Sequence, residues 1–200
     1  MTGRIVVLIS GNGGNLQAVI DACADGRIDG QIVAVISNKK SAYGLERAQN
    51  HEIPAVHFPY KPYRESGREA YDSALADEVT SHQPDLIVLA GWLRILTPSF
   101  LDRFPRQVIN LHPALPGQFD GLHAVERAYE AYQAGKIDVS GCMIHYAIPK
   151  VDAGEVIEWT IVEIKPDDTL QSFGARITYH EHRIIVKAVQ KVLRQQKEAT

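Results

Sequence analysis

The sequence predicts an α/β domain in which helices flank a mostly parallel β-sheet. Short apolar segments rich in β-branched residues recur along the first half of the chain. Segments with helical spacing separate them, and Gly, Pro and Asn mark the junctions. Strands that are apolar on both faces and alternate with helices are typical of parallel sheets covered on both sides.

The elements follow one another in a regular order. In the first part we expect strands at 5–9, 32–36, 55–58, 86–90 and 108–112, and helices at 16–24, 43–50, 67–82 and 98–104. A loop with Pro and Gly over 113–121 leads to a helix at 124–134. Strands at 142–148 and 156–164 then form an antiparallel pair, and a long helix covers 169–195. This order is that of a Rossmann-like fold, with its site at the C-terminal ends of the parallel strands.

Length and composition limit the class of protein. Two hundred residues suit a single domain over 1–200, and we expect a frayed tail at 195–200. A net charge of −3 does not favour a nucleic-acid partner, and no segment approaches a membrane span or a signal peptide. Cys23 and Cys142 show no metal or redox spacing, so we expect free buried thiols in a reducing, cytoplasmic setting. The sequence leaves the oligomeric state undetermined.

Asn110 and His112 are the most informative polar residues. They end an apolar strand, whose two-residue period places them on one face and Ile109 and Leu111 on the other. An amide can donate to a developing oxyanion, and an imidazole can exchange a proton near neutral pH. The carboxylate of Asp152 could fix the tautomer of His112 and raise its pKa. The alternative is a pair of satisfied polar residues at a strand end.

A glycine-rich loop, Ser10-Gly11-Asn12-Gly13-Gly14-Asn15, joins the first strand to the first helix. Glycine permits positive φ and close approach of a ligand, and a helix N-terminus offers free N–H groups. The third Gly of a dinucleotide fingerprint is replaced by Leu16, and the Gly-Lys-Ser/Thr of a P-loop is missing. The pattern favours a site for one phosphate of a small molecule, with a tight turn as the alternative.

Two charged residues interrupt apolar stripes. Glu181 lies on the apolar stripe of the last helix, where a carboxylate is costly unless it is paired. It predicts either a structural salt bridge or a contact with a ligand hydroxyl or amine. Arg94 interrupts the run at 86–96, either to meet an internal carboxylate or because its segment lines a pocket for a planar ring. Arg68 is a candidate for an anionic ligand, and His145 is expected to be structural.

Together these segments resemble the glycinamide ribonucleotide branch of the folate-dependent formyltransferase superfamily. The resemblance extends from Ile5 to about Leu193 and rests on the segments VLISGNGGNLQA (7–18), LAGWLRIL (89–96), INLHP (109–113), VDAG (151–154) and EH (181–182). The Asn-x-His pair with a distant Asp is shared by the wider superfamily. The glycine loop combined with Glu181 is specific to the branch.

The resemblance implies a reaction and a role for each residue. A formyl group would pass from 10-formyltetrahydrofolate to the amine of glycinamide ribonucleotide in purine biosynthesis, with these small molecules as partners and no metal. The implied catalytic residues are Asn110, His112 and Asp152. Those implied for the ribonucleotide are Gly13, Gly14, Asn15 and Glu181. Those implied for the folate are Arg68, Leu93, Arg94, Ile95, Leu96 and Asn110.

The chain departs from the family pattern in two places. Gly14 stands where members commonly have Ser, which removes a hydroxyl donor but keeps the backbone N–H. The loop at 113–121 replaces the commoner His-Pro-Ser-Leu-Leu-Pro pattern with a shifted proline. We expect weaker phosphate binding at most from the first change and altered loop contacts from the second.

Other functions compete with this one. A formyltetrahydrofolate hydrolase-like enzyme would carry an added N-terminal domain, and the methionyl-tRNA and sugar-nucleotide formyltransferases an added C-terminal one, whereas this chain suits one domain. A non-catalytic sensor of a phosphoribosyl ligand is the alternative outside enzymes. A sensor has no need of an oxyanion site, so the combination of Asn110, His112 and Asp152 favours an enzyme.

Overall fold

A computed structural model describes residues 2–198, which form one seven-stranded β-sheet flanked by helices. The strands are β1 (Gly3–Ile9), β2 (Gly30–Ser37), β3 (Ala55–His57), β4 (Leu86–Leu89), β5 (Val108–His112), β6 (Val139–Tyr146) and β7 (Val156–Glu163). Their order across the sheet is β3-β2-β1-β4-β5-β6-β7. Neighbours from β3 to β5 are parallel, whereas β6 is antiparallel to both β5 and β7. The predicted fold class is confirmed.

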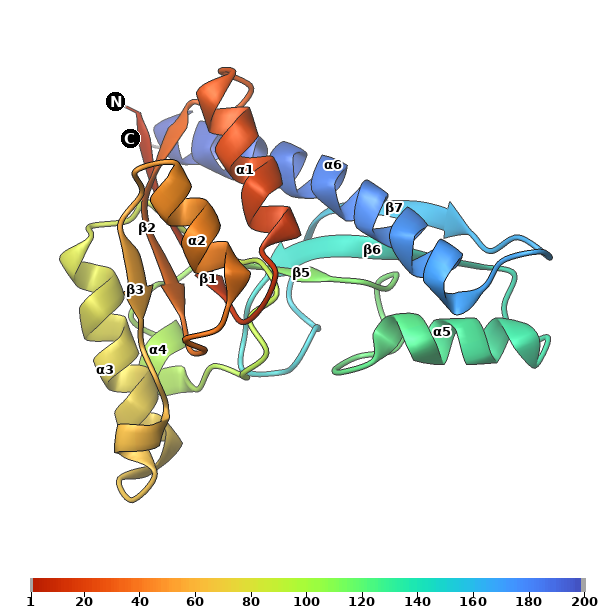
Figure 1. The fold of residues 1–200 in the computed structure, drawn as a ribbon, viewed down its shortest axis with the longest axis horizontal. Helices are drawn as coiled ribbons and strands as arrows, with labels where there is room; N and C mark the ends of the chain where they lie inside the picture. Colours follow the sequence, from red (N-terminus) through yellow and green to blue (C-terminus); the bar gives the residue numbers. More distant parts are fainter. Residues whose placement is uncertain (1, 199–200) are drawn as a thin grey trace.

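Helices cover both faces of the sheet. They are α1 (Gly14–Ala24), α2 (Tyr43–Asn50), α3 (Gly67–Ser81), α4 (Pro98–Leu101), α5 (Ala124–Gln133) and α6 (Leu170–Glu198), with a short 3₁₀ helix η1 (Lys61–Tyr63) before α3. α1, α2 and α6 lie on one face and α3 and α4 on the other (Figure 1). The central strands therefore bury side chains on both faces, which explains why β1 is apolar at consecutive positions.

The strand order sets the place of the functional site. β1 lies between β2 and β4, so the chain leaves β1 on one side and later returns on the other. At such a switch point a crevice forms outside the carboxyl ends of the strands. The glycine loop after β1, the segment after β4 and the end of β5 all lie at this edge of the sheet.

A smaller apolar cluster supports the C-terminal part of the molecule. It joins α5, β7 and α6, with Ala128, Val162, Phe173 and Ile177 at its centre. In Figure 1 these elements extend away from the parallel part of the sheet. Phe119 of the loop at 113–123, which covers the end of β5, packs against this cluster.

Several boundaries differ from prediction, by three residues at most, and α4 for example ends at Leu101 rather than at residue 104. β6 begins at Val139 rather than at residue 142, because Ser140 and Gly141 already pair with β7. α6 continues to Glu198, although a frayed tail was expected from residue 195. Lys197 forms an ion pair with Asp29, which holds the last turns against the turn before β2. Residues 199–200 lie outside the described part of the chain.

Both cysteines are free thiols in hydrophobic surroundings. Cys23 is half-buried and Cys142 is buried. Burial raises the pKa of Cys23 to about 11 and that of Cys142 to about 12, so neither is a reactive thiolate near neutral pH. Within residues 2–198, no helix is both long and apolar enough to cross a membrane.

Candidate active site

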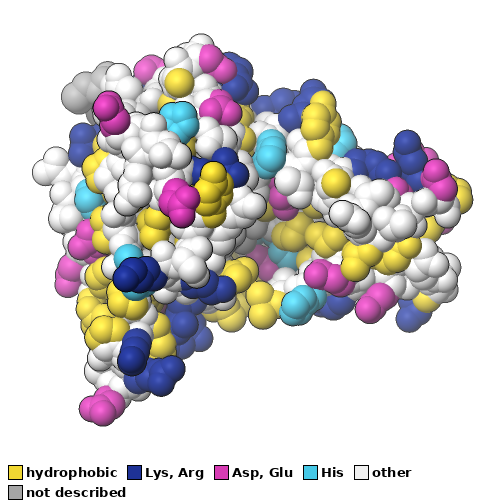
Figure 2. Space-filling model, viewed as in Figure 1, with side chains coloured by type: hydrophobic (Ala, Val, Ile, Leu, Met, Phe, Trp, Pro, Cys, Tyr) yellow, Lys and Arg dark blue, Asp and Glu magenta, His cyan; other side chains and the backbone are white. Residues whose placement is uncertain are grey.

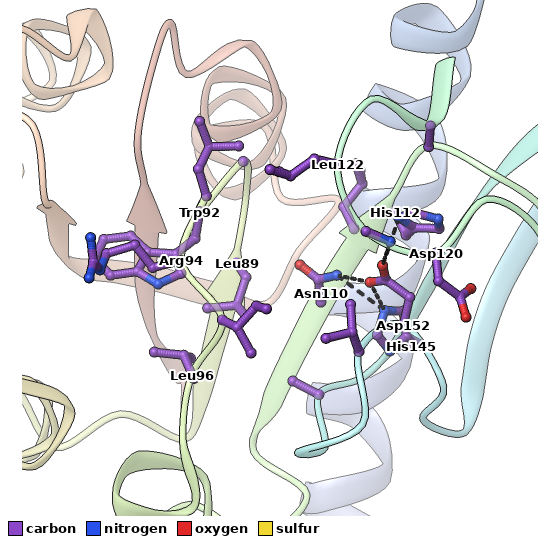
Figure 3. Close-up of a pocket in the computed structure, with 18 of the residues that line it drawn as sticks. Leu89, Trp92, Arg94, Leu96, Asn110, His112, Asp120, Leu122, His145 and Asp152 are labelled. Carbon is purple, nitrogen blue, oxygen red and sulfur yellow. Dashed lines mark hydrogen bonds and ion pairs between the residues drawn. The ribbon is translucent and has the colours of Figure 1, made fainter. Parts of the chain in front are cut away.

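A cavity of about 860 Å³ opens at the C-terminal edge of the sheet. One wall is the segment after β4, and the other is the end of β5 with the loops that hold Asp120 and Asp152 (Figure 3). Asn15 and Glu181 also line the cavity, from the start of α1 and the middle of α6. Such a concave space, with apolar walls and a few polar groups, is the usual form of a small-molecule site.

β5 delivers two polar side chains to the cavity. Ile109 packs in the core on the α6 side of the sheet, and Asn110 and His112 project from the opposite face as predicted. The antiparallel register pairs Asn110 with His145 of β6. Cross-strand partners share a face, so the imidazole of His145 is brought to the amide of Asn110. His145, which the sequence predicts to be structural, is buried and also lines the cavity.

Asp152 reaches the same group from the loop between β6 and β7. Its backbone is left-handed, with φ of 50°. Gly154 makes this turn possible, because a Cβ there would lie 1.8 Å from the carbonyl oxygen of Tyr146. The N–H of Gly121 donates to Oδ2 of Asp152 at 2.8 Å.

One carboxylate therefore connects three side chains. Oδ2 of Asp152 lies 3.2 Å from Nδ1 of His112. Oδ1 accepts a hydrogen bond of 3.2 Å from the amide of Asn110 and lies 3.4 Å from Nε2 of His145. The amide nitrogen of Asn110 also lies 3.1 Å from Nε2 of His145. The predicted proximity of Asn110, His112 and Asp152 is present, as Figure 3 shows.

The direction of the His112 pKa corrects the expectation from sequence. We expected Asp152 to raise it, yet the pKa of His112 lies below its ordinary value because burial of the ring outweighs the attraction of Asp152. For Asp152, burial raises the pKa, but hydrogen bonds from His145 and Gly121 and the nearby imidazoles together leave it below its ordinary value. At neutral pH the pair is a neutral imidazole and a carboxylate.

The glycine loop is fixed between α2 and α6. Gly13 has φ of 77°, and a Cβ there would lie 2.8 Å from the Cα of Gly44, so only glycine fits. Gly14 faces the ring of His182, whose Nε2 is buried and has no hydrogen-bond partner among residues 2–198. Gly13 and Gly14 do not line the cavity itself, whereas Asn15 does. Their backbone lies at the N-terminus of α1, next to the cavity.

Glu181 is buried and accepts a hydrogen bond of 3.1 Å from the side-chain amide of Asn15. Burial raises its pKa. No ion pair to Glu181 exists among residues 2–198, so the salt-bridge alternative is wrong. The carboxylate faces the cavity with capacity to accept hydrogen bonds from a ligand.

The segment after β4 forms the opposite wall. The lining residues include Arg68, Leu93, Arg94, Ile95 and Leu96, all of which the resemblance implied for the folate. Arg68 donates to the carbonyl of Ile95, and the N–H of Leu93 donates to the hydroxyl of Ser10 at 3.0 Å. Leu93 and Ile95 are more than half exposed, and with Trp92 they make the wall apolar.

Arg94 pairs with no carboxylate among residues 2–198, whereas its segment lines the cavity, as the second interpretation from the sequence expected. Its guanidinium stacks over the ring of Tyr60, 3.9 Å from the ring centre, and lies near Tyr71. Figure 3 shows it directed away from Asn110 and Asp152. Both rings belong to the apolar cluster between the sheet and α3. Figure 2 shows hydrophobic side chains at the surface over η1 and α3, at its lower left. Arg94 thus fixes the wall through cation–π contacts.

The loop at 113–123 adds cavity residues that the sequence did not single out. Asp120, Gly121 and Leu122 line the cavity, and the side chain of Leu122 points between the two walls (Figure 3). Leu122 is 65% exposed, and a leucine in a loop has no periodic pattern that could mark it as a cavity residue in the sequence. Over residues 2–198, no group of three or more His, Cys, Asp or Glu side chains could hold a metal ion.

Comparison with known proteins places these observations in a family. Residues 3–189 match the formyl transferase family model. Phosphoribosylglycinamide formyltransferase of Schizosaccharomyces pombe is 44% identical over 96% of this chain and 98% of its own length. The trifunctional purine biosynthetic protein adenosine-3 of Chironomus tentans is 40% identical over 94% of this chain and 14% of its own length. The crystal structure of glycinamide ribonucleotide transformylase 1 from Symbiobacterium toebii is 39% identical, with a TM-score of 0.89 over 94% of this chain and 86% of that one.

Proposed function

The chain belongs to the phosphoribosylglycinamide formyltransferases, and from this premise we propose that Asn110, His112 and Asp152 are its catalytic residues. The protein transfers the formyl group of 10-formyltetrahydrofolate to the amine of glycinamide ribonucleotide in purine biosynthesis. One observation carries the residue assignment. The buried carboxylate of Asp152 contacts both Asn110 and His112 at the wall of the cavity.

The reduced folate supplies the formyl group in this reaction. A bond forms between the amine nitrogen and the formyl carbon, the bond from that carbon to the folate nitrogen breaks, and an amine proton ends on that nitrogen. Negative charge develops on the formyl oxygen, and a single well-placed donor to such an oxygen is worth about 3 kcal/mol. The residues at the end of β5 supply donors of this kind.

His112 moves the proton. Its imidazole is neutral before reaction, so it can accept the proton of the attacking amine. The resulting imidazolium is stabilised by Asp152 at Nδ1 and can donate from Nε2 to the developing oxyanion. It then returns the proton to the departing nitrogen.

Asn110 is the second donor to the formyl oxygen. Asp152 and His145 hold its amide, and both contacts use the amide nitrogen. One N–H group must therefore turn from these partners to the substrate. The remaining contact keeps the amide aligned.

The two substrates occupy opposite parts of the cavity. We place the ribose hydroxyls at Glu181 and Asn15 and the phosphate at the backbone N–H groups of Gly13 and Gly14. The folate ring lies against the segment from Leu93 to Leu96, with Arg68 toward its anionic end. Apolar walls with a few polar groups suit a planar heterocycle. The formyl carbon then lies between them, at Asn110 and His112.

Turnover measured by the absorbance change on release of the folate product tests this function. We expect release only when both substrates are present. Release with water alone would instead indicate a hydrolase, and binding of the ribonucleotide without release would indicate a sensor. We further propose that the chain works as one domain over 1–200 in the cytoplasm, on these two small molecules.

A further inference from the structure

Arg127 of α5 contacts the loop that carries Gly121. Its guanidinium donates to the backbone carbonyl of Phe119 and, at 2.7 Å, to that of Asp120. The backbone of Phe119 is left-handed, with φ of 51°, and its ring packs on the apolar cluster of α5, β7 and α6. A left-handed non-glycine residue carries strain and persists only where the surroundings impose it. Arg127 and the cluster supply that constraint.

A chain of direct contacts connects Arg127 to the catalytic group. The N–H of Gly121 follows the two carbonyls held by Arg127 and donates to Oδ2 of Asp152. The same oxygen lies beside Nδ1 of His112. The carbonyl of Gln118, in the same loop, lies 3.4 Å from Nε2 of His112. The loop therefore contacts both members of the His112–Asp152 pair.

We propose that Arg127 is a positioning residue for formyl transfer, which acts through the loop at 118–121 to hold Asp152 and His112 in their reactive arrangement. This inference rests on the proposed function of those two residues. It gives a specific purpose to the altered loop at 113–121, whose conformation is fixed by a side chain from the following helix. Arg127 itself does not line the cavity and so touches no substrate.

The mechanism predicts an effect on turnover and on its pH dependence. Without Arg127 the Gly121 N–H no longer stays aligned with Asp152. That hydrogen bond helps to hold the pKa of Asp152 below its ordinary value, so its loss raises the pKa. The limb of the kcat profile that reports protonation of Asp152 should then move to higher pH. Substrate-binding groups on the opposite wall are unaffected, so both KM values should change little.

The test compares Arg127→Met and Arg127→Lys with the control Arg103→Met. Arg103 also donates to a backbone carbonyl, that of Ser73, and to the carboxylate of Asp77. It lies on the side of the sheet that α4 covers and does not line the cavity. Misplacement of catalytic groups by about 1 Å costs up to roughly a hundredfold in rate, so we expect Arg127→Met to lower kcat by about ten- to a hundredfold. Arg127→Lys, which can hold one carbonyl at a time, should fall between the wild type and Arg127→Met.

Amide hydrogen exchange supplies a readout that does not depend on activity. In Arg127→Met the Gly121 amide should exchange faster, while Arg103→Met leaves it unchanged. A loss of thermal stability with wild-type kcat and an unmoved pH profile would overturn the inference. If Arg127→Met does not fold, Arg127→Lys tests the inference in its place. An unchanged kcat and an unchanged pH profile in Arg127→Lys would also overturn the inference. Lack of turnover by the wild type would instead refute the proposed function itself.

Discussion

The carboxylate of Asp152 lies 3.2 Å from Nδ1 of His112, and both side chains are less than a tenth exposed. In such surroundings water screens the pair weakly, so each group strongly affects the protonation of the other. Burial nevertheless dominates for the imidazole, which stays neutral at rest. The contact with Asp152 therefore stabilises the imidazolium of His112 that arises during the reaction. This role has several measurable consequences.

Replacement of His112 by Ala should abolish most turnover. The variant loses both the proton acceptor and a donor to the oxyanion, and such a loss costs at least about a hundredfold in kcat. KM for both substrates should stay within about threefold, because the ring contributes little to ground-state binding. Steady-state kinetics check this, with replacement of the exposed His57 of β3 by Ala as the control. Near-normal kcat in His112→Ala would refute its catalytic role.

Asp152→Asn should shift the titration of His112 to lower pH. The negative charge of Asp152 raises the pKa of His112 against the effect of burial, so a neutral amide leaves burial unopposed. The acid limb associated with His112 should move down in pH, while the plateau of kcat falls because the imidazolium is no longer stabilised. NMR titration of the His112 ring measures the shift directly. An upward shift would contradict the assigned electrostatics.

His145→Leu should lower turnover, because His145 contacts both Asn110 and Asp152. His145 helps to keep the pKa of Asp152 low and orients the amide of Asn110. Its loss should raise the pKa of Asp152 and lower kcat by about tenfold, a typical cost for removing a supporting hydrogen bond. His145→Gln, which retains a polar end near Asn110, should recover part of the rate. Equal rates for both variants would rule out the polar role.

Glu181→Gln should stabilise the folded protein and weaken binding of the ribonucleotide. Burial raises the pKa of Glu181 above its ordinary 4.5, so the folded protein holds a proton that the unfolded chain releases. The stability that protonated Glu181 contributes is fully present below pH 4.5. It is lost as the pH rises through the pKa that Glu181 has in the folded protein. The Gln variant avoids this loss, so its advantage in unfolding free energy should grow with pH over that interval.

The same variant should bind the ribonucleotide less tightly. A carboxylate accepts stronger hydrogen bonds from ribose hydroxyls than an amide does, so KM for the ribonucleotide should rise roughly tenfold while KM for the folate stays constant. Denaturation at several pH values and steady-state kinetics measure the two effects. A rise in the KM for the folate alone would show that Glu181 contacts the folate rather than the ribonucleotide.

Gly14→Ser should restore a hydroxyl at the phosphate end. The backbone of Gly14 is not left-handed, and a new Cβ lies 3.1 Å from Nε2 of His182, so a slight movement of that ring is required. The hydroxyl can then contact the unpartnered His182 nitrogen or the phosphate. We expect KM for the ribonucleotide to fall a few-fold, with kcat unchanged, in the same steady-state assay. Gly13→Ser is the matched contrast, because its left-handed backbone and contact with Gly44 should make it destabilising.

Local patterns in the sequence determined the fold class, the parallel strands and the face shared by Asn110 and His112. Burial on both faces of the sheet requires apolar runs, and the pleat of a strand fixes alternation, so these features can be predicted without knowing distant neighbours. The family resemblance then identified Asp152 and the two substrate sides. In the structure Asn15, Asp152 and Glu181 line one cavity, whereas Gly13 and Gly14 lie beside it.

Only the tertiary structure decided how these residues affect one another. The register of β5 with β6 brought His145 to Asn110, and the path of the loop at 113–121 joined Arg127 and Gly121 to Asp152. The pKa of His112 depends on the balance of burial against one carboxylate, and that balance depends on the packing around the ring rather than on sequence spacing. Contacts between distant segments have no periodic signal in the chain, because they arise only when the loops and strands close over the end of β5.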